Sequence, residues 1–284
     1  MLYHKFSTQN EIDQEYNPSL IVNNFELNLE NYFTESKRVL KEYSHKSGVA
    51  YGPTKAEILD IFPADITTAP AHIFFHGGYW HSFQSIDFAF IAEGLLRNGI
   101  TAIIVNYALC PSVKIDEIVR QSSAAVAWIY INAKSIGVNP DQITVSGHSA
   151  GGHLAGMLMS VSWENDYGVP QDLIKGFLPI SGLFDLSPFQ FSWLQPKLQL
   201  TSEEVMRYSP LLNKPSSSSP VLLAVGADES SEFHRQSEKY AEYLINNGIS
   251  TKYISVKGKN HFNIIDSFLG DGGIFCEKIL EWSH

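Results

Sequence analysis

Ser149 stands in a pattern that would make its hydroxyl a nucleophile. It is the central residue of Gly147-His148-Ser149-Ala150-Gly151, which fits the motif G-x-S-x-G. The motif follows a strand-like run, 143–146, and precedes a helical pattern that begins at Gly152. In such a turn the serine occupies a strained backbone position, and flanking glycines are needed because larger residues would collide. The turn also raises the hydroxyl above the sheet, near the positive end of the helix. We therefore expect Ser149 to attack an acyl carbon.

A serine nucleophile needs a general base, and the order of residues along the chain indicates where that base lies. In hydrolases with this turn, an acid and then a histidine follow the serine, each in a loop after a late strand. Of the ten histidines, His261 alone lies in the loop after the last predicted strand. The acid is expected after the preceding strand, where Asp228 and Glu229 are adjacent. The residues alone do not decide between them, because either carboxylate can hold the imidazole in the required tautomer.

A second glycine motif, His76-Gly77-Gly78-Tyr79-Trp80, follows a short buried strand upstream of the serine. This is the position of the loop that builds half of an oxyanion hole. Small residues let backbone N–H groups approach the substrate oxygen, and each such donor contributes about 3 kcal/mol to the transition state. We expect His76 to hold the loop by hydrogen bonds and not to react. The residues expected to form the oxyanion hole are Gly77, Gly78, Tyr79 and Ala150.

Short strand patterns alternate with longer helical patterns, which is typical of a mostly parallel sheet with helices on both faces. Strands are predicted at 56–62, 72–75, 101–106, 142–146, 176–180, 220–225 and 250–256. Helices are predicted at 27–43, 87–96, 115–136, 152–162, 233–247 and 272–282. With the two motifs, this order predicts an α/β-hydrolase fold in a single domain, 1–284. The pattern breaks at about 183–215, where only 202–208 is helical; since long irregular insertions are usually functional, we expect a small cap over the active site.

Composition narrows the classes of partner and cofactor. The 284 residues carry a net charge of −10, which a nucleic acid would repel. Neither a signal peptide nor a membrane-spanning run is expected, so the interpretation is a cytoplasmic protein with a small-molecule substrate and no membrane partner. The two cysteines, Cys110 and Cys276, are interpreted as buried free thiols. We expect no metal and no cofactor, and the sequence leaves homodimerisation open.

Several segments resemble the kynurenine formamidase (arylformamidase) family, in its metal-independent serine-hydrolase form. The segment 76–80 resembles the family's His-Gly-Gly-Tyr-Trp oxyanion signature, and 106–111 resembles its Asn-Tyr-x-Leu-Cys-Pro segment. The nucleophile stretch 148–154 is similar, with Gly152 where many members have Ala. Tyr16-Asn17-Pro18-Ser19 resembles the family's N-terminal Tyr-x-Pro-Ser. The resemblance extends over most of the chain.

The resemblance bears on the choice of acid. In animal members an Asp stands directly before Ser-Pro-Glu-Phe, and here Ser230-Ser231-Glu232-Phe233 occupies that place. The matching position is therefore Glu229, so the resemblance favours Glu229 over Asp228. A Glu at this position departs from the animal pattern and has one more methylene, so its loop is expected to lie slightly farther from the histidine.

The resemblance implies hydrolysis of N-formyl-L-kynurenine to L-kynurenine and formate. The leaving group is a large aromatic amine, which suits a cleft lined by aromatic side chains. Each candidate aromatic residue could equally be part of the core. The alternative is a carboxylesterase or amidase that acts on other small aryl or alkyl esters or amides. A non-catalytic relative of the same fold would normally lack a catalytic residue, whereas all are present. The aromatic residues expected to line the cleft are Tyr79, Trp80, Phe83, Phe189, Phe191 and Trp193.

Overall fold

A computed structural model of the chain describes residues 1–269 and 273–283, and an eight-stranded sheet forms their centre. The strand order is β1-β2-β4-β3-β5-β6-β7-β8. Strand β2 is antiparallel to both of its neighbours, and every pair from β4 to β8 is parallel. The predicted mostly parallel sheet is confirmed. Its strands are β1 (Lys46–Ala50), β2 (Ile58–Phe62), β3 (Ala69–Phe75), β4 (Thr101–Val105), β5 (Val138–His148), β6 (Ile174–Ile180), β7 (Val221–Gly226) and β8 (Thr251–Val256).

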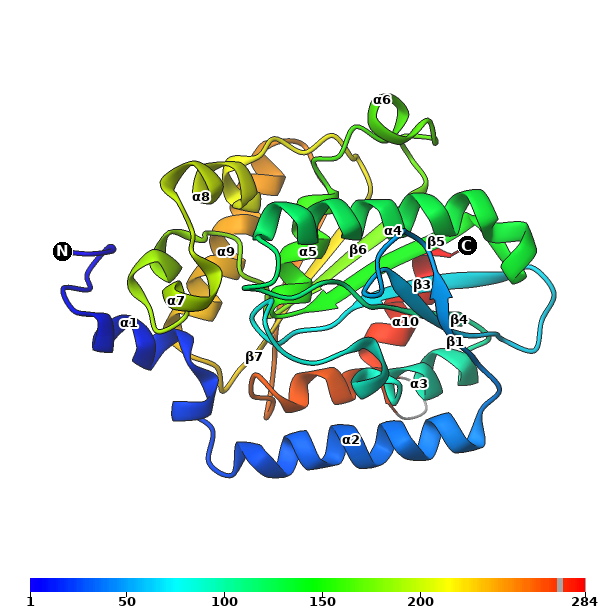
Figure 1. Cartoon of the computed structure of the whole chain (residues 1–284), viewed down its shortest axis with the longest axis horizontal. Coiled ribbons are helices and arrows are strands. Elements are labelled where there is room, and N and C mark those ends of the chain that lie inside the picture. Colours follow the sequence, from blue (N-terminus) through cyan, green and yellow to red (C-terminus); the bar gives the residue numbers. More distant parts are fainter. Residues whose placement is uncertain (270–272, 284) are drawn as a thin grey trace.

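Helices cover both faces of this sheet (Figure 1). One face carries α4 (Ile115–Ile136), α5 (Ala150–Leu158) and α9 (Ser231–Asn246), and the other carries α2 (Phe25–Glu42), α3 (Ile91–Arg97) and α10 (Ile274–Trp282). Successive side chains of a strand point to opposite faces. Ile73 and Phe75 of β3 therefore join the core under α4, α5 and α9, while Phe74 packs in the core under α2, α3 and α10.

The remaining helices and 3-10 turns are short. The chain begins with α1 (Gln9–Tyr16) and the 3-10 turn η1 (Pro18–Leu20), and α6 (Trp163–Tyr167) follows α5. Two further 3-10 turns, η2 (Ser85–Phe88) and η5 (Asn263–Phe268), follow the loops at 76–80 and 258–262. The stretch 183–215 folds into η3 (Ser187–Phe191), α7 (Gln195–Leu198), α8 (Ser202–Tyr208) and η4 (Pro210–Leu212).

The structure differs from the sequence prediction at several elements. The helix predicted at 87–96 is divided into η2 and α3, because the Asp87 carboxylate accepts the backbone N–H of Gln84 at 2.9 Å and closes a tight turn there. Helices α1, α6 and α7 and strand β1 were not predicted, so 202–208 is not the only helix within 183–215. In α1, seven of eight residues are polar or aromatic and only Ile12 and Tyr16 are buried, so its apolar pattern is weak. Gly272, the expected start of the last helix, lies outside the described residues.

Two expectations from composition can be compared with the structure. None of the helices in 1–269 and 273–283 is long and apolar enough to span a bilayer. Cys110 and Cys276 are both buried free thiols, as predicted. Burial raises the pKa of the Cys110 thiol to about 11 and that of Cys276 to about 12, so both remain protonated and unreactive at neutral pH.

Candidate active site

Ser149 lies in the sharp turn that joins β5 to α5. Its backbone has φ 57° and ψ −114°, a conformation that costs a residue with a side chain of order 1–3 kcal/mol. The flanking glycines are required by close packing. A Cβ atom on Gly151 would overlap the carbonyl oxygen of Phe75 in β3, and one on Gly147 would overlap the carbonyl oxygen of Gly151. The motif therefore lets the turn sit against the neighbouring strand while the serine side chain is held at its apex.

There is also a steric reason for a glycine at position 152, where many members of the family have Ala. A Cβ atom there would lie 2.8 Å from the Cα atom of Gly182 and 2.9 Å from the carbonyl oxygen of Ile180. In this chain the loop after β6 therefore packs directly on the backbone of α5. The departure from the family pattern is a local packing feature beneath the nucleophile.

A chain of hydrogen bonds joins Ser149, His261 and Glu229. The Ser149 Oγ atom lies 3.0 Å from His261 Nε2, and His261 Nδ1 lies 2.7 Å from Glu229 Oε2. His261 is buried, and the side chain of Glu229 is fully enclosed although its backbone is partly exposed. With Nδ1–H donating to the carboxylate, Nε2 carries the lone pair that can accept the serine proton. The three residues thus have the geometry of a nucleophile, a general base and the acid that orients it.

The structure distinguishes the two candidate acids. The second oxygen of Glu229, Oε1, accepts hydrogen bonds from the Gly226 N–H at 2.7 Å and the Ser181 hydroxyl at 2.5 Å. These donors stabilise the ionised carboxylate and fix its orientation. Asp228 instead lies at the exposed surface of the loop, where its N–H donates to the Lys259 carbonyl at 3.0 Å. Glu229, and not Asp228, contacts the histidine.

The loop 76–80 lies directly against Ser149. A Cβ atom on Gly77 would be 3.1 Å from the His148 carbonyl oxygen and 3.3 Å from Ser149 Cβ. Gly78, Tyr79 and Trp80 have φ values of 104°, 49° and 58°, so three successive residues are in the left-handed region. Such a turn directs backbone N–H groups toward one side of the loop. In the described part of the chain, no acceptor pairs with the backbone N–H of Gly78, Tyr79 or Ala150.

Two histidines support this arrangement without contacting the serine hydroxyl. His76 Nδ1 donates to the Gly77 carbonyl at 2.8 Å, and its ring stacks on Tyr107 at 4.2 Å. His148 Nε2 donates to the carbonyl oxygen of His261 at 2.8 Å, which joins the turn that carries Ser149 to the loop that carries His261. Burial lowers the pKa of His76 to about 4. Burial, followed by repulsion from His261, holds the pKa of His148 well below its ordinary value. Both rings are therefore neutral at pH 7.

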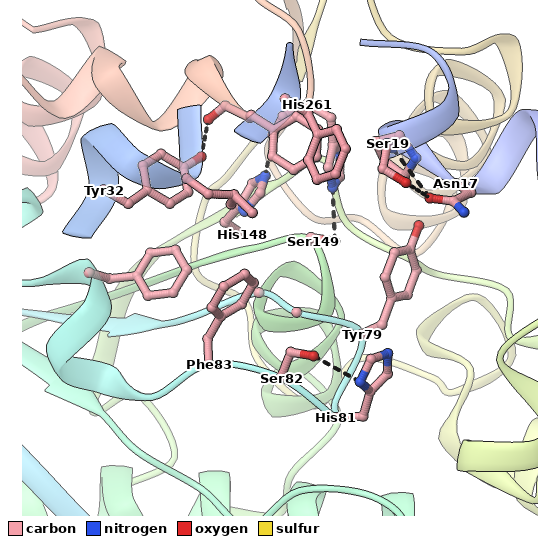
Figure 2. Close-up of a pocket in the computed structure, with 17 residues that line it drawn as sticks. Asn17, Ser19, Tyr32, Tyr79, His81, Ser82, Phe83, His148, Ser149 and His261 are labelled. Atoms are coloured by element: carbon pink, nitrogen blue, oxygen red, sulfur yellow. Dashed lines mark hydrogen bonds between the residues drawn. The ribbon is translucent and has the colours of Figure 1, made fainter. Parts of the chain in front are cut away.

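Ser149 and His261 open into a cleft of about 280 Å³. Figure 2 shows Ser149 at its centre, with Asn17, Ser19, Tyr79 and His81 on one side and Tyr32 and Phe83 on the other. A volume near 300 Å³ is at the lower end of the range for small-molecule sites. The full lining consists of Asn17, Pro18, Ser19, Phe25, Leu29, Tyr32, Gly77, Gly78, Tyr79, His81, Ser82, Phe83, Phe88, His148, Ser149, His261 and Phe262.

Of the six aromatic residues predicted to line the cleft, Tyr79 and Phe83 do so and four do not. Trp80 is fully buried, and its indole N–H donates to His153 Nδ1 at 3.2 Å. Phe189 is also fully buried and packs edge-on against Tyr79 and Trp80. Trp193 packs on the far edge of Tyr79, and Phe191 is 37% exposed outside the cleft. Phe189, Phe191 and Trp193 miss the cleft because the stretch 183–215 packs behind Tyr79, and none of its residues is in the cleft lining; Trp80 turns into the core against Phe189.

The N-terminal segment occupies the place that was expected of the cap. Six of the lining residues come from 17–32, where the sequence predicts only a helix that begins at residue 27. Its attachment explains why. The Tyr79 hydroxyl donates to the carbonyl oxygen of Tyr16, and the Tyr16 hydroxyl donates to Glu232 Oε2 at 2.7 Å and accepts from Gln236 Nε2 at 2.9 Å. The one sequence signal for this role was the segment 16–19, which was noted as a family feature without a function.

A solved structure and a family model are similar to this chain. A solved structure from Silicibacter sp. TM1040, provisionally assigned as a thioesterase, superposes with a TM-score of 0.85 over 95% of this chain and 99% of its own, at 24% identity, which supports the fold alone. The sheet topology and the strand-to-helix position of Ser149 define an α/β hydrolase. A family model described as BD-FAE matches residues 59–179.

Closer relatives identify the family. The kynurenine formamidase of Danio rerio is 30% identical over 240 residues, which cover 82% of this chain and 80% of that protein. The kynurenine formamidase of Salmo salar is 32% identical over 240 residues, covering 82% of this chain and 79% of that protein. The chain belongs to the kynurenine formamidase family.

Proposed function

We propose that this hydrolase uses Ser149 as its nucleophile, requires no metal, and hydrolyses N-formyl-L-kynurenine to L-kynurenine and formate. The observation that carries the proposal is the continuous hydrogen-bonded chain from Ser149 through His261 to Glu229 at the centre of the cleft. Membership of the family supplies the substrate class, because the relatives of similar length are kynurenine formamidases.

The first half of the reaction forms a formyl-enzyme. His261 Nε2 takes the Ser149 hydroxyl proton while Oγ bonds to the formyl carbon, and the carbonyl oxygen becomes an oxyanion. The unpaired N–H groups of Gly78, Tyr79 and Ala150 are the donors for this charge. The protonated His261 then gives its proton to the aniline nitrogen, the C–N bond breaks, and L-kynurenine leaves.

The second half releases formate. Water loses a proton to His261 Nε2 and attacks the formyl carbon of the ester. The tetrahedral intermediate collapses, the proton returns to Ser149 Oγ, and formate departs. Glu229 remains ionised throughout and stabilises the imidazolium that forms in each half. In 1–269 and 273–283, no group of three or more His, Cys, Asp or Glu residues is placed to hold a metal ion.

The test compares two substrates on the purified enzyme. We expect release of equal amounts of kynurenine and formate from N-formyl-L-kynurenine, with kcat/KM well above that for phenyl acetate and unchanged by EDTA. Phenyl acetate represents the alternative, a carboxylesterase for small aryl esters. A clear preference for phenyl acetate would overturn the proposed substrate while leaving the serine chemistry intact. Loss of all activity in EDTA, restored by a divalent metal, would overturn the mechanism.

A further inference from the structure

The cleft has two chemically different sides. Phe25, Leu29, Tyr32, Phe83, Phe88 and Phe262 supply an apolar surface. Asn17, Ser19, His81 and Ser82 supply polar groups, and in Figure 2 Asn17 and Ser19 lie together on the side away from Tyr32 and Phe83, with His81 beyond Tyr79. Among the described residues that line the cleft there is no Lys, Arg, Asp or Glu. The cleft therefore suits a ligand with an aromatic part and a polar part whose charges sum to zero.

The Asn17 side chain lines the cleft with one end of its amide paired and the other end unpaired. Its Oδ1 atom accepts from the Ser19 hydroxyl at 2.6 Å and from the Ser19 N–H at 3.3 Å. Both are donors, so they require the oxygen of the amide, which leaves Nδ2 on the opposite side. No acceptor in the described part of the chain takes a hydrogen bond from Nδ2. Two N–H donors are thus left unpaired at the cleft wall.

This donor pair is held in place by the residue that precedes it. Tyr16 is fully buried and is bonded to the oxyanion loop through Tyr79 and to α9 through Glu232 and Gln236. Arg235 forms an ion pair with Glu232 at 2.8 Å, so the Tyr16 hydroxyl is bonded to a fixed carboxylate. Asn17 consequently keeps a defined position relative to Tyr79, and a preorganised donor discriminates better between ligands than a mobile one.

We infer that Asn17 determines substrate specificity by binding the α-amino-acid end of the leaving group through its side-chain amide. This inference rests on the proposed function. The α-carboxylate of kynurenine can accept both N–H groups of Nδ2, and the neighbouring ammonium makes the amino-acid end neutral overall, which is why no charged partner is needed. A substrate without this end leaves the Asn17 donors unpaired in the bound state, and sites of this kind reject such analogues.

The test uses two substrates that share the same scissile bond. N-formyl-L-kynurenine carries the amino-acid end, and 2-formamidoacetophenone has the same aryl formamide and ketone without it. The decisive variant is Asn17→Asp, which keeps an oxygen for both Ser19 hydrogen bonds, removes the two N–H donors and places a negative charge opposite the carboxylate. Asn23→Asp is the matched control, because Asn23 adds the same charge on the same segment but is exposed and outside the cleft.

We expect Asn17→Asp to lower kcat/KM for N-formyl-L-kynurenine about 10- to 100-fold, mainly through KM. The value for 2-formamidoacetophenone should stay within about twofold, as should both values for Asn23→Asp. Equal losses on both substrates would mean that Asn17 only supports the turn, and unchanged kinetics on both would mean that it contacts no ligand; either result overturns the inference. A wild-type enzyme that cleaves 2-formamidoacetophenone but not N-formyl-L-kynurenine would overturn the proposed function, and the inference with it.

Discussion

Replacement of Glu229 by Gln tests the catalytic geometry most directly, because the structure fixes how the new amide must lie. In the wild type, Oε1 already accepts two hydrogen bonds, from the Gly226 N–H and the Ser181 hydroxyl. In Glu229→Gln the amide oxygen must take that place, since an NH₂ group cannot accept from the Gly226 N–H. The NH₂ group then faces His261 Nδ1, which has to become an acceptor. The proton moves to Nε2, where it prevents the ring from accepting the Ser149 proton.

The expected loss follows from two effects. The wrong tautomer and the missing negative charge beside the imidazolium together lower kcat about 10⁴-fold, the loss seen for the corresponding change in a serine protease. The shape of the side chain is retained, so the thermal unfolding midpoint should change little. Asp228→Asn is the matched control, because it makes the same chemical change one residue earlier on an exposed side chain. It should leave kcat within about twofold.

Initial rates with N-formyl-L-kynurenine and with phenyl acetate under saturating conditions provide the assay, and thermal unfolding checks the fold of each variant. The reasoning would be refuted if folded Glu229→Gln retained more than about a tenth of wild-type kcat, since the tautomer argument allows about a thousandth or less. It would also fail if Asp228→Asn lost as much activity as Glu229→Gln. The use of two substrates separates an error in the acid from an error in the substrate.

Three further predictions follow from packing and protonation. Ser149→Ala should remain folded, lose several orders of magnitude in kcat and no longer be labelled by a fluorophosphonate probe; labelling of the variant at the wild-type rate would show that another residue is the nucleophile. Gly151→Ala should lower the free energy of unfolding by about 3 kcal/mol or more in urea titrations, because its Cβ overlaps a β3 carbonyl, whereas a change below about 1 kcal/mol would contradict the close packing. Burial holds three imidazoles neutral in the folded chain, with pKa values of about 3, 4 and 4, so protons bind preferentially to the unfolded state below its ordinary pKa of about 6.5. The three residues are His72, His76 and His153. The free energy of unfolding should therefore be fully retained above that pH and fall by up to about 4 kcal/mol per pH unit as the pH drops toward 4. A free energy of unfolding that stays constant from pH 7 to 5 would contradict this prediction.

The parts of the site that could be predicted from sequence are those that local rules determine. The position of Ser149 follows from a steric requirement that only glycines meet. The structure shows this requirement at Gly147 and Gly151, where a Cβ atom would overlap neighbouring backbone atoms. His261 follows from chain order, because the last strand of this topology places its loop beside the nucleophile. Helix α4 has the bounds 115–136 that its apolar periodicity predicts. The choice of Glu229 needed the family resemblance, since two adjacent carboxylates look alike until their surroundings are known.

The parts that could not be predicted depend on contacts between distant segments. An aromatic residue in an irregular stretch gives no sign of which side it faces, so Trp80 and Phe189 looked like cleft residues although both fill the core behind Tyr79. The N-terminal wall is a similar case. Asn17 and Ser19 are ordinary turn residues in sequence. Their place in the cleft is decided by bonds from Tyr16 to residues 216 and 220 positions away.

Those same bonds connect two parts of the proposed catalytic site that are far apart in the sequence. Tyr16 is bonded on one side to Tyr79, in the oxyanion loop, and on the other to Glu232, in the first turn of the helix that begins two residues after Glu229. A shift of the N-terminal segment would therefore move the oxyanion donors and the acid loop together. Because bonds in a buried polar network strengthen one another, and loss of one leaves its partner unsatisfied in a low-dielectric interior, such a shift is costly. The segment that lines the cleft thus also links the loop proposed to stabilise the oxyanion to the helix that follows Glu229.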